Sequence, residues 1–246
     1  MSEPVAPRVA LVTGGSRGIG QAIVRCLVED GLRVAFTWRR DEAAARELEE
    51  RLGGAARAFP FALEDAKRPD ALMREVEAAM GPIEVLVNNA AERRPSLLAL
   101  TSDAQWNATL DANLGGTFRC CRAAVRGMIA LRKGAIISLG SLAATSGVPG
   151  EAAYSASTAG VVALTRTLAR EVGRFGVRVN AVVPGLVATD MTRDLPEAAI
   201  AALRARECLR TGTTAEAVAG AVAFLASDRA EAITGQVIVV DAGASA

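Results

Sequence analysis

A glycine-rich turn near the start of the chain carries the clearest chemical signal. Thr13-Gly14-Gly15-Ser16-Arg17-Gly18-Ile19-Gly20 follows the apolar run Val9–Thr13 and opens an amphipathic stretch that ends before Gly31. Glycines let the backbone approach a pyrophosphate, and the helix that follows offers free N–H groups and positive dipole charge. A glycine cluster alone also fits an ordinary tight turn, but this strand–turn–helix context predicts a dinucleotide site. The expected contacts are Gly14, Ser16, Arg17, Gly18, Ile19 and Gly20.

The end of the second predicted strand indicates which dinucleotide is bound. Arg33–Trp38 is followed by Arg39 and Arg40, with no acid before Asp41. An acidic residue there would hydrogen-bond a ribose 2′-hydroxyl, whereas Arg39 together with Arg17 could hold a 2′-phosphate. The alternative is a pair of solvated arginines in an arginine-rich chain. The pattern favours NADP(H) over NAD(H).

Strand-like and helix-like segments alternate along the chain. Apolar runs such as Val85–Val87 and Val177–Val183 are typical of strands buried between two helical layers. The alternation predicts a doubly wound α/β fold of the Rossmann type, a parallel sheet with helices on both faces. We expect an N-terminal tail (residues 1–7) and one domain (8–246), with the irregular residues 186–210 as a mobile substrate lid.

Composition excludes several classes of function. The chain has 246 residues, 51% of them apolar, and its 28 basic and 27 acidic residues nearly cancel, which argues against nucleic acid as the main partner. It has no histidine, so histidine triads, ligands and bases are excluded, and four cysteines without a CxxC pattern predict no metal site. No apolar run reaches 18 residues and no leader pattern is present, so we expect a cytoplasmic protein with no membrane span.

Several motifs in order resemble the classical short-chain dehydrogenase/reductase family. The resemblance covers about Arg8 to Gly243 and rests on TGxxxGxG at Thr13, Gly14, Gly18 and Gly20, on Asn88-Asn89-Ala90, and on Pro184-Gly185 followed by Thr189. It implies further cofactor contacts at Asn89, Ala90, Pro184, Gly185 and Thr189. Within the family the chain looks most like 3-oxoacyl-[acyl-carrier-protein] reductases, although sugar, steroid and polyketide reductases share many of these segments.

The same resemblance implies a catalytic group. Tyr154, the only tyrosine, follows Ser141 by 13 residues. In the family's reaction NADPH gives a hydride to a ketone carbon; Tyr154 would protonate the oxygen, Ser141 would orient it, and Asn113 would hold a water in a proton relay. The alternatives are a packing tyrosine, an ordinary loop serine and an asparagine that only shapes its helix.

Three positions depart from the family pattern. Position 158, which lies on the same helix face as Tyr154, is Thr158 where the family motif YxxxK has lysine. Lys67 and Lys133 are too distant in sequence to replace it. Ala62 stands where an aspartate often contacts adenine, and Ala91 stands where the family has glycine. We expect the loss of lysine to lower activity about 10²–10⁴-fold, within the range of acid–base assistance.

These observations lead to one leading hypothesis and three others. The first is NADPH-dependent reduction of a 3-oxoacyl thioester, carried on acyl carrier protein, to the 3-hydroxyacyl form, with Arg132 and Arg174 either forming a patch for the acidic carrier or remaining solvated. The second is a catalytically impaired paralogue that keeps the fold and acts as a partner subunit or cofactor sensor. Thr158 introduced on purpose is a third reading, and nucleic-acid binding is the most distant. The resemblance also implies a homo- or hetero-oligomer, commonly a tetramer, using Ala152–Val172 and the last strand.

Overall fold

The computed structural model describes residues 7–193, 195 and 197–246, so the expected tail lies outside it except for Pro7. Its described residues form one parallel seven-stranded sheet in the order β3-β2-β1-β4-β5-β6-β7. The strands are β1 Val9–Val12, β2 Arg33–Trp38, β3 Ala56–Pro60, β4 Ile83–Asn88, β5 Gly134–Leu139, β6 Val177–Pro184 and β7 Val237–Val240. The strand order reverses between β1 and β4, which creates a crevice at their carboxyl ends.

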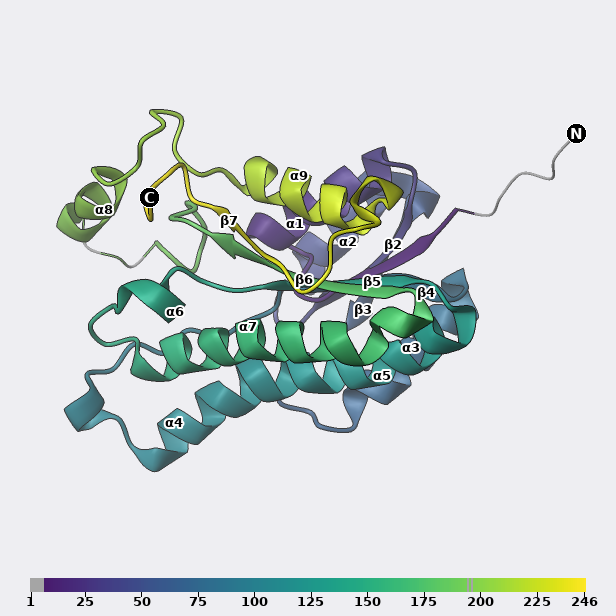
Figure 1. Cartoon of the computed structure of the whole chain (residues 1–246), viewed down its shortest axis with the longest axis horizontal. Helices are drawn as coiled ribbons and strands as arrows, with labels where there is room; N and C mark the ends of the chain where they lie inside the picture. Colours follow the sequence, from purple (N-terminus) through teal and green to yellow (C-terminus); the bar gives the residue numbers. More distant parts are fainter. Residues whose placement is uncertain (1–6, 194, 196) are drawn as a thin grey trace, which may run out of the picture.

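Helices cover both faces of this sheet, as Figure 1 shows. One face carries α1 (Gly18–Glu29), α2 (Glu42–Leu52) and α9 (Ala215–Ala226), and the other carries α3 (Arg68–Met80), α5 (Gly116–Leu131) and α7 (Ala152–Val172). The shorter helices are α4 (Asp103–Leu110), α6 (Ala143–Ser146) and α8 (Glu197–Arg204). The predicted doubly wound fold is confirmed.

Two apolar cores explain why the strands are apolar on both faces. Val12 and Val34 pack with Ile23 of α1 on one side, while Leu11 and Ile136 pack with the helices of the other side. Successive side chains of a strand point to opposite faces, so each central strand contributes to both cores.

Two local predictions can be compared with the structure. The sequence by itself predicts the third strand at Ala58–Leu63. In the structure β3 spans Ala56–Pro60, so the predicted bounds are wrong. Its partner β2 ends at Trp38, which pairs with Pro60, so no ladder remains for the residues beyond. The sequence also predicts a helix over Thr101–Arg132 with a break near Gly115-Gly116. In the structure α4 and α5 are joined through a π-helical turn at Asp111–Gly115, so the hydrogen-bond pattern changes there while the helix continues.

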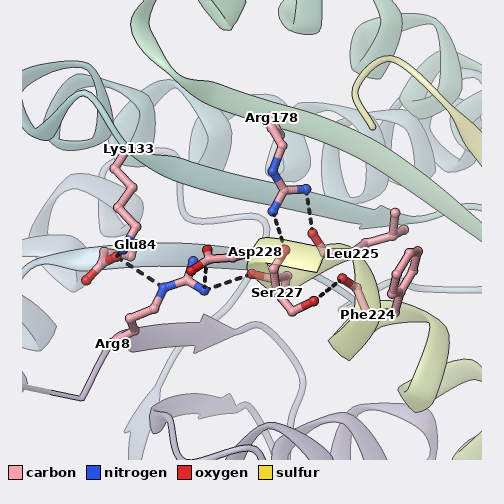
Figure 2. A network of polar contacts seen from close by, with 9 residues as sticks. Arg8, Glu84, Lys133, Arg178, Phe224, Leu225, Ser227 and Asp228 are labelled. Carbon is pink, nitrogen blue, oxygen red and sulfur yellow. Dashed lines mark hydrogen bonds and ion pairs between the residues drawn. The ribbon is translucent and has the colours of Figure 1, made fainter. Parts of the chain in front are cut away.

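Charged residues join the amino ends of the strands, at the edge opposite the crevice (Figure 2). Arg8 pairs with Glu84 at 3.1 Å and with Asp228 at 3.6 Å, and Lys133 also pairs with Glu84 at 2.9 Å. Arg178 donates to two carbonyl groups at the end of α9. This network attaches α9 to the sheet without touching the crevice. Within the described residues, no helix is both long and apolar enough to cross a membrane.

Candidate active site

The glycine-rich turn lies at the crevice and packs tightly against its neighbours. The N–H of Gly14 donates to Thr37 Oγ1 and that of Gly15 to the Thr37 carbonyl, both at 2.9 Å. Gly14 and Gly18 have φ of +67° and +55°, a region that favours glycine. A Cβ atom on Gly20 would lie 2.1 Å from the Gly14 carbonyl oxygen. Helix α1 therefore approaches the turn so closely that side chains are excluded.

Thr13 and Asn89 hold this turn against the end of β4. Thr13 Oγ1 accepts from the N–H groups of Asn89 at 3.0 Å and Ala90 at 3.1 Å. The Asn89 side-chain amide donates to the carbonyls of Thr13 at 3.0 Å and Gly14 at 2.9 Å. The Asn89 side chain thus shapes the crevice. Ala90 lines it, since a Cβ on Gly14 would lie 3.1 Å from the Ala90 Cα.

The start of α1 fits the pyrophosphate of a dinucleotide. Arg17 stands at the N-cap without a side-chain cap, and the first turn holds no acid, so the first N–H groups stay available for phosphate oxygens. Of the expected contacts, Ser16 lies in the glycine-rich turn and Ile19 in the first turn of α1. Across from them, a Cβ on Gly18 would approach Thr189 Cγ2 at 3.3 Å, and Arg17 pairs with Asp190 at 2.9 Å.

Pro184 and Gly185 end β6 on the far side of the crevice. The Gly185 N–H donates to the Val240 carbonyl at 2.8 Å. A Cβ on Gly185 would lie 2.7 Å from both Asp241 Cα and Thr213 Oγ1. The chain therefore leaves β6 in close contact with Asp241 and Thr213, and this contact leaves no space for a side chain at position 185.

Arg39 binds two acids from neighbouring strand ends. Its guanidinium pairs with Glu64, which follows β3, at 2.5 Å, and with Glu92, which follows β4. Glu92 also pairs with Arg94 at 2.6 Å. The Glu92 side chain is only 14% exposed and that of Arg39 is 34% exposed. Arg39 is thus bound by carboxylates. Neither of the two predictions for it, a contact with a 2′-phosphate or a solvated surface arginine, included these partners.

Tyr154 and Ser141 come together at the carboxyl edge of the sheet, at the start of α7 and just after β5. Burial raises the pKa of Tyr154, the hydrogen bond with Ser141 opposes that rise, Glu151 adds to it and Arg93 lowers it. Ser141 Oγ also accepts from a backbone N–H at 3.1 Å. The phenol therefore keeps its proton at neutral pH and can act as a proton donor.

Asn113 lies in the π-helical turn and connects the segment after β4 to α7. Its Oδ1 accepts from the Glu92 N–H at 2.7 Å, and its Nδ2 donates to the Glu92 carbonyl at 2.9 Å and to Ser157 Oγ at 3.1 Å. The Ser157 hydroxyl in turn donates to the Tyr154 carbonyl at 2.7 Å. Sequence reasoning missed Ser157, and its i+3 spacing from Tyr154 was the only available signal.

The Thr158 hydroxyl turns back onto its own helix. It donates to the carbonyls of Tyr154 at 3.0 Å and Ser155 at 3.1 Å, and the residue is only 3% exposed. Threonine commonly makes such bonds within a helix. Position 158 thus places neither a positive charge nor a free hydroxyl beside the phenol.

The two arginines considered as a carrier patch lie far from Tyr154. Arg132 follows α5 and Arg174 follows α7, and they meet where an Arg132 N–H donates to the Arg174 carbonyl at 3.5 Å. Both precede the amino ends of strands, whereas Tyr154 lies near the first turn of α7. At 1.5 Å per residue, the length of α7 separates Tyr154 from Arg174 by roughly 30 Å. The structure does not bring these two arginines near Tyr154 of the same chain.

The described residues hold no cluster of three or more metal-ligating side chains. Burial raises the pKa of Cys120 and of Cys121 to about 12, so both thiols stay protonated. Neither supplies a reactive thiolate to the site.

Comparison with known proteins agrees with this geometry. A family model described as enoyl-(acyl carrier protein) reductase matches residues 14–245. The chain is 39% identical over 236 residues to the 3-oxoacyl-[acyl-carrier-protein] reductase FabG of Salmonella typhimurium and 38% identical to that of Escherichia coli K12, covering 96% of each chain in both comparisons. A crystal structure titled as a putative short-chain alcohol dehydrogenase from Sinorhizobium meliloti 1021 superposes with a TM-score of 0.92 at 36% identity, covering 98% of this chain and 97% of that one.

Proposed function

Since the chain belongs to the short-chain dehydrogenase/reductase family, we propose that it reduces a 3-oxoacyl thioester, carried on acyl carrier protein, to the 3-hydroxyacyl thioester with NADPH. The observation that carries the proposal is the position of the Tyr154–Ser141 pair at the same sheet edge as the glycine turn. Relatives named 3-oxoacyl-[acyl-carrier-protein] reductase, aligned over nearly their full length, support the choice of substrate.

The chain's own groups would handle the proton of this reaction. The bound dinucleotide would supply the hydride that reduces the keto carbon. Tyr154 would donate its phenolic proton to the carbonyl oxygen, and Ser141 would hydrogen-bond that oxygen and orient it. The Asn113 side-chain amide hydrogen-bonds to Glu92 and Ser157, which favours a role in positioning these segments. A contact between Asn113 and a relay water stays a prediction.

The residues that would hold the dinucleotide come from four strand ends. The adenosine end would lie beside Arg39 and the pyrophosphate on the first turn of α1. The nicotinamide end would lie between Ala90 and Thr189. Arg39 stands at the strand position that reads the ribose 2′ substituent, which supports NADP(H). The remaining expected contacts are Gly14, Ser16, Arg17, Gly18, Ile19, Gly20, Asn89, Pro184 and Gly185.

The acyl chain would lie under residues 186–210. Leu209 is 61% exposed, and Met191 and Leu203 are also exposed, so the described part of this segment offers apolar surface. Met191 Sδ lies 4.0 Å from the Tyr154 hydroxyl, so this residue of the segment contacts the group that would donate the proton. These contacts support its role as the substrate lid.

A second candidate, a catalytically impaired paralogue that still binds NADP(H), is favoured by Thr158. Its hydroxyl is committed to the helix backbone, so no charge from this position assists Tyr154. Such a protein would serve as a partner subunit in a mixed assembly or as a cofactor sensor.

We also propose that the chain forms an oligomer, with a tetramer as the expected state. Strand β7 lies at the edge of the sheet and exposes Ile238 and Val239, and Phe224 of α9 is exposed nearby in sequence. Exposed apolar edge strands are prone to pair with another chain. Helix α7 leaves the small residues Ala159 and Ala163 exposed. Light scattering that finds a monomer at micromolar concentration would contradict this proposal.

The test is NADPH consumption with a 3-oxoacyl thioester, offered both on acyl carrier protein and as a small soluble thioester. NADPH binding is followed in parallel by its fluorescence. We expect turnover that Tyr154→Phe lowers at least 100-fold while NADPH binding remains, since only the proton donor is removed. Binding without turnover would favour the impaired paralogue. Absence of binding would refute both candidates.

A further inference from the structure

The ion pair between Arg39 and Glu92 spans the crevice of the dinucleotide site. Arg39 follows β2 and Glu92 follows β4, and these strands flank β1 on either side. Two strand spacings amount to about 10 Å, so the pair passes over the carboxyl end of β1, where the glycine turn lies. The pair belongs to the wall of the site at its adenosine end.

Glu92 is the fixed partner of this pair. Asn113 binds both its backbone N–H, at 2.7 Å, and its carbonyl, at 2.9 Å. Its side chain is mostly buried, whereas the Arg39 side chain is more exposed and follows a strand end. A change of partner at this position therefore moves the Arg39 guanidinium and leaves the carboxylate in place.

We propose that Glu92 sets the cofactor preference of this chain by competing with a 2′-phosphate for Arg39. The inference rests on the proposed function, because it assumes that a nicotinamide dinucleotide occupies the crevice. The Glu92 carboxylate holds the guanidinium position that a 2′-phosphate would take, since both anions bind arginine through forked hydrogen bonds. A phosphorylated ribose must draw the Arg39 guanidinium away from that carboxylate.

An unphosphorylated ribose meets a different site. The Arg39–Glu92 pair stays closed, and the more exposed Glu64 carboxylate can accept a hydrogen bond from the ribose hydroxyls, as an acid does in NAD sites. Glu92 thus weakens binding of the phosphorylated ligand and leaves the other unaffected. The chain consequently discriminates less between NADPH and NADH than Arg39 alone would achieve.

The experiment uses two nucleotide fragments that differ only at the 2′ position, adenosine 2′,5′-bisphosphate and adenosine 5′-monophosphate, with Kd measured by calorimetry at low salt. In Glu92→Gln we expect about tenfold tighter binding of the bisphosphate, equivalent to about 1.4 kcal/mol, and less than a twofold change for the monophosphate. Glu64→Gln removes the more exposed of the two carboxylates that bind the same guanidinium, so we expect a smaller gain in affinity for the bisphosphate, of about threefold.

Two controls isolate the cause. Glu42→Gln removes a carboxylate from a surface pair with Arg46 and makes the same change in net charge, so it should alter neither Kd. In an Arg39→Ala background the effect of Glu92→Gln on the bisphosphate should disappear. Thermal unfolding verifies that each variant is folded. If Glu92→Gln does not fold, Glu64→Gln still tests whether a carboxylate competes with the phosphate for Arg39.

The possible results separate this inference from the proposed function. If Glu92→Gln changes both fragments equally, or changes neither, the competition is refuted while dinucleotide binding stands. If neither the fragments nor NADPH bind to the wild type or any variant, the inference fails together with the proposed cofactor.

Discussion

Replacing Thr158 by lysine would place a positive charge one helical turn from Tyr154. The position is nearly buried, so solvent would screen that charge weakly. A unit charge about 4 Å from the phenol oxygen contributes roughly 4 kcal/mol at an effective dielectric near 20, or about three pKa units. Because burial raises the pKa of Tyr154 in the chain with Thr158, the lysine would make the phenol a much stronger acid.

We expect Thr158→Lys to raise kcat/KM for thioester reduction by about 10²–10⁴-fold. Reduction needs protonated Tyr154, so its alkaline limit follows the tyrosine pKa. The chain with Thr158 should keep its rate to a pH above the ordinary tyrosine pKa of about 10, and Thr158→Lys should lose rate at a lower pH. Thr158→Met supplies a long neutral side chain, and Thr158→Val removes only the hydroxyl. Neither should reproduce the gain or the shift in pH.

Several results would refute this reasoning. The chain with Thr158 could already turn over as fast as Thr158→Lys, which would make the charge dispensable. Thr158→Met could match the lysine variant, which would attribute the gain to side-chain length. A folded Thr158→Lys that binds NADPH but shows no faster turnover would show that another part of the site limits the reaction.

Three further outcomes test the structure. Gly20→Ala should abolish NADPH binding and lower the free energy of unfolding in urea by more than about 2 kcal/mol, because its Cβ would lie 2.1 Å from a carbonyl oxygen. Asp241→Asn should cost about 1–2 kcal/mol at pH 7. Burial tends to raise the pKa of Asp241, but hydrogen bonds from Ser245 and Gly243 outweigh burial and lower it. The ionised Asp241 side chain therefore stabilises the fold above the pKa of an unfolded aspartate, which is near 4. The stability difference between Asp241→Asn and the unsubstituted chain should vanish as the pH falls through the lower pKa of the folded state. Exposed Cys208 should react with a thiol reagent well before buried Cys120 and Cys121, as mass spectrometry of the labelled chain would show.

Features set by neighbouring residues were predictable from the sequence. Asp and Thr are residue types preferred at helix N-caps, so both caps can be predicted from the sequence. Asp41 caps α2 by accepting from the Ala44 N–H at 3.0 Å, and Thr214 caps α9 by accepting from the Ala217 N–H at 3.1 Å. Cap geometry depends on a few adjacent residues, so it survives whatever the rest of the chain does. The end of β3 was missed because it depends on the length of β2, a distant partner.

The same distinction, between features set by neighbouring residues and features set by distant ones, applies to the candidate site. The glycine turn could be identified from spacing, and the pairing of Tyr154 with Ser141 from resemblance. The partners of Arg39 could not, because Glu64 and Glu92 reach it only through the strand order of the folded sheet. The sequence predicts which groups are present at the site, and the topology decides which charges they meet.

This division also determines what a substitution at position 158 can reveal. The turn is held by Thr13 and Asn89, and the segment after β4 by Asn113, through hydrogen bonds in which the Thr158 side chain takes no part. Within the described residues, the Thr158 hydroxyl hydrogen-bonds to the backbone of its own helix. Substitution there should change the charge beside Tyr154 and leave the crevice intact. A difference in rate between the lysine and methionine variants therefore measures the electrostatic contribution to catalysis in this chain.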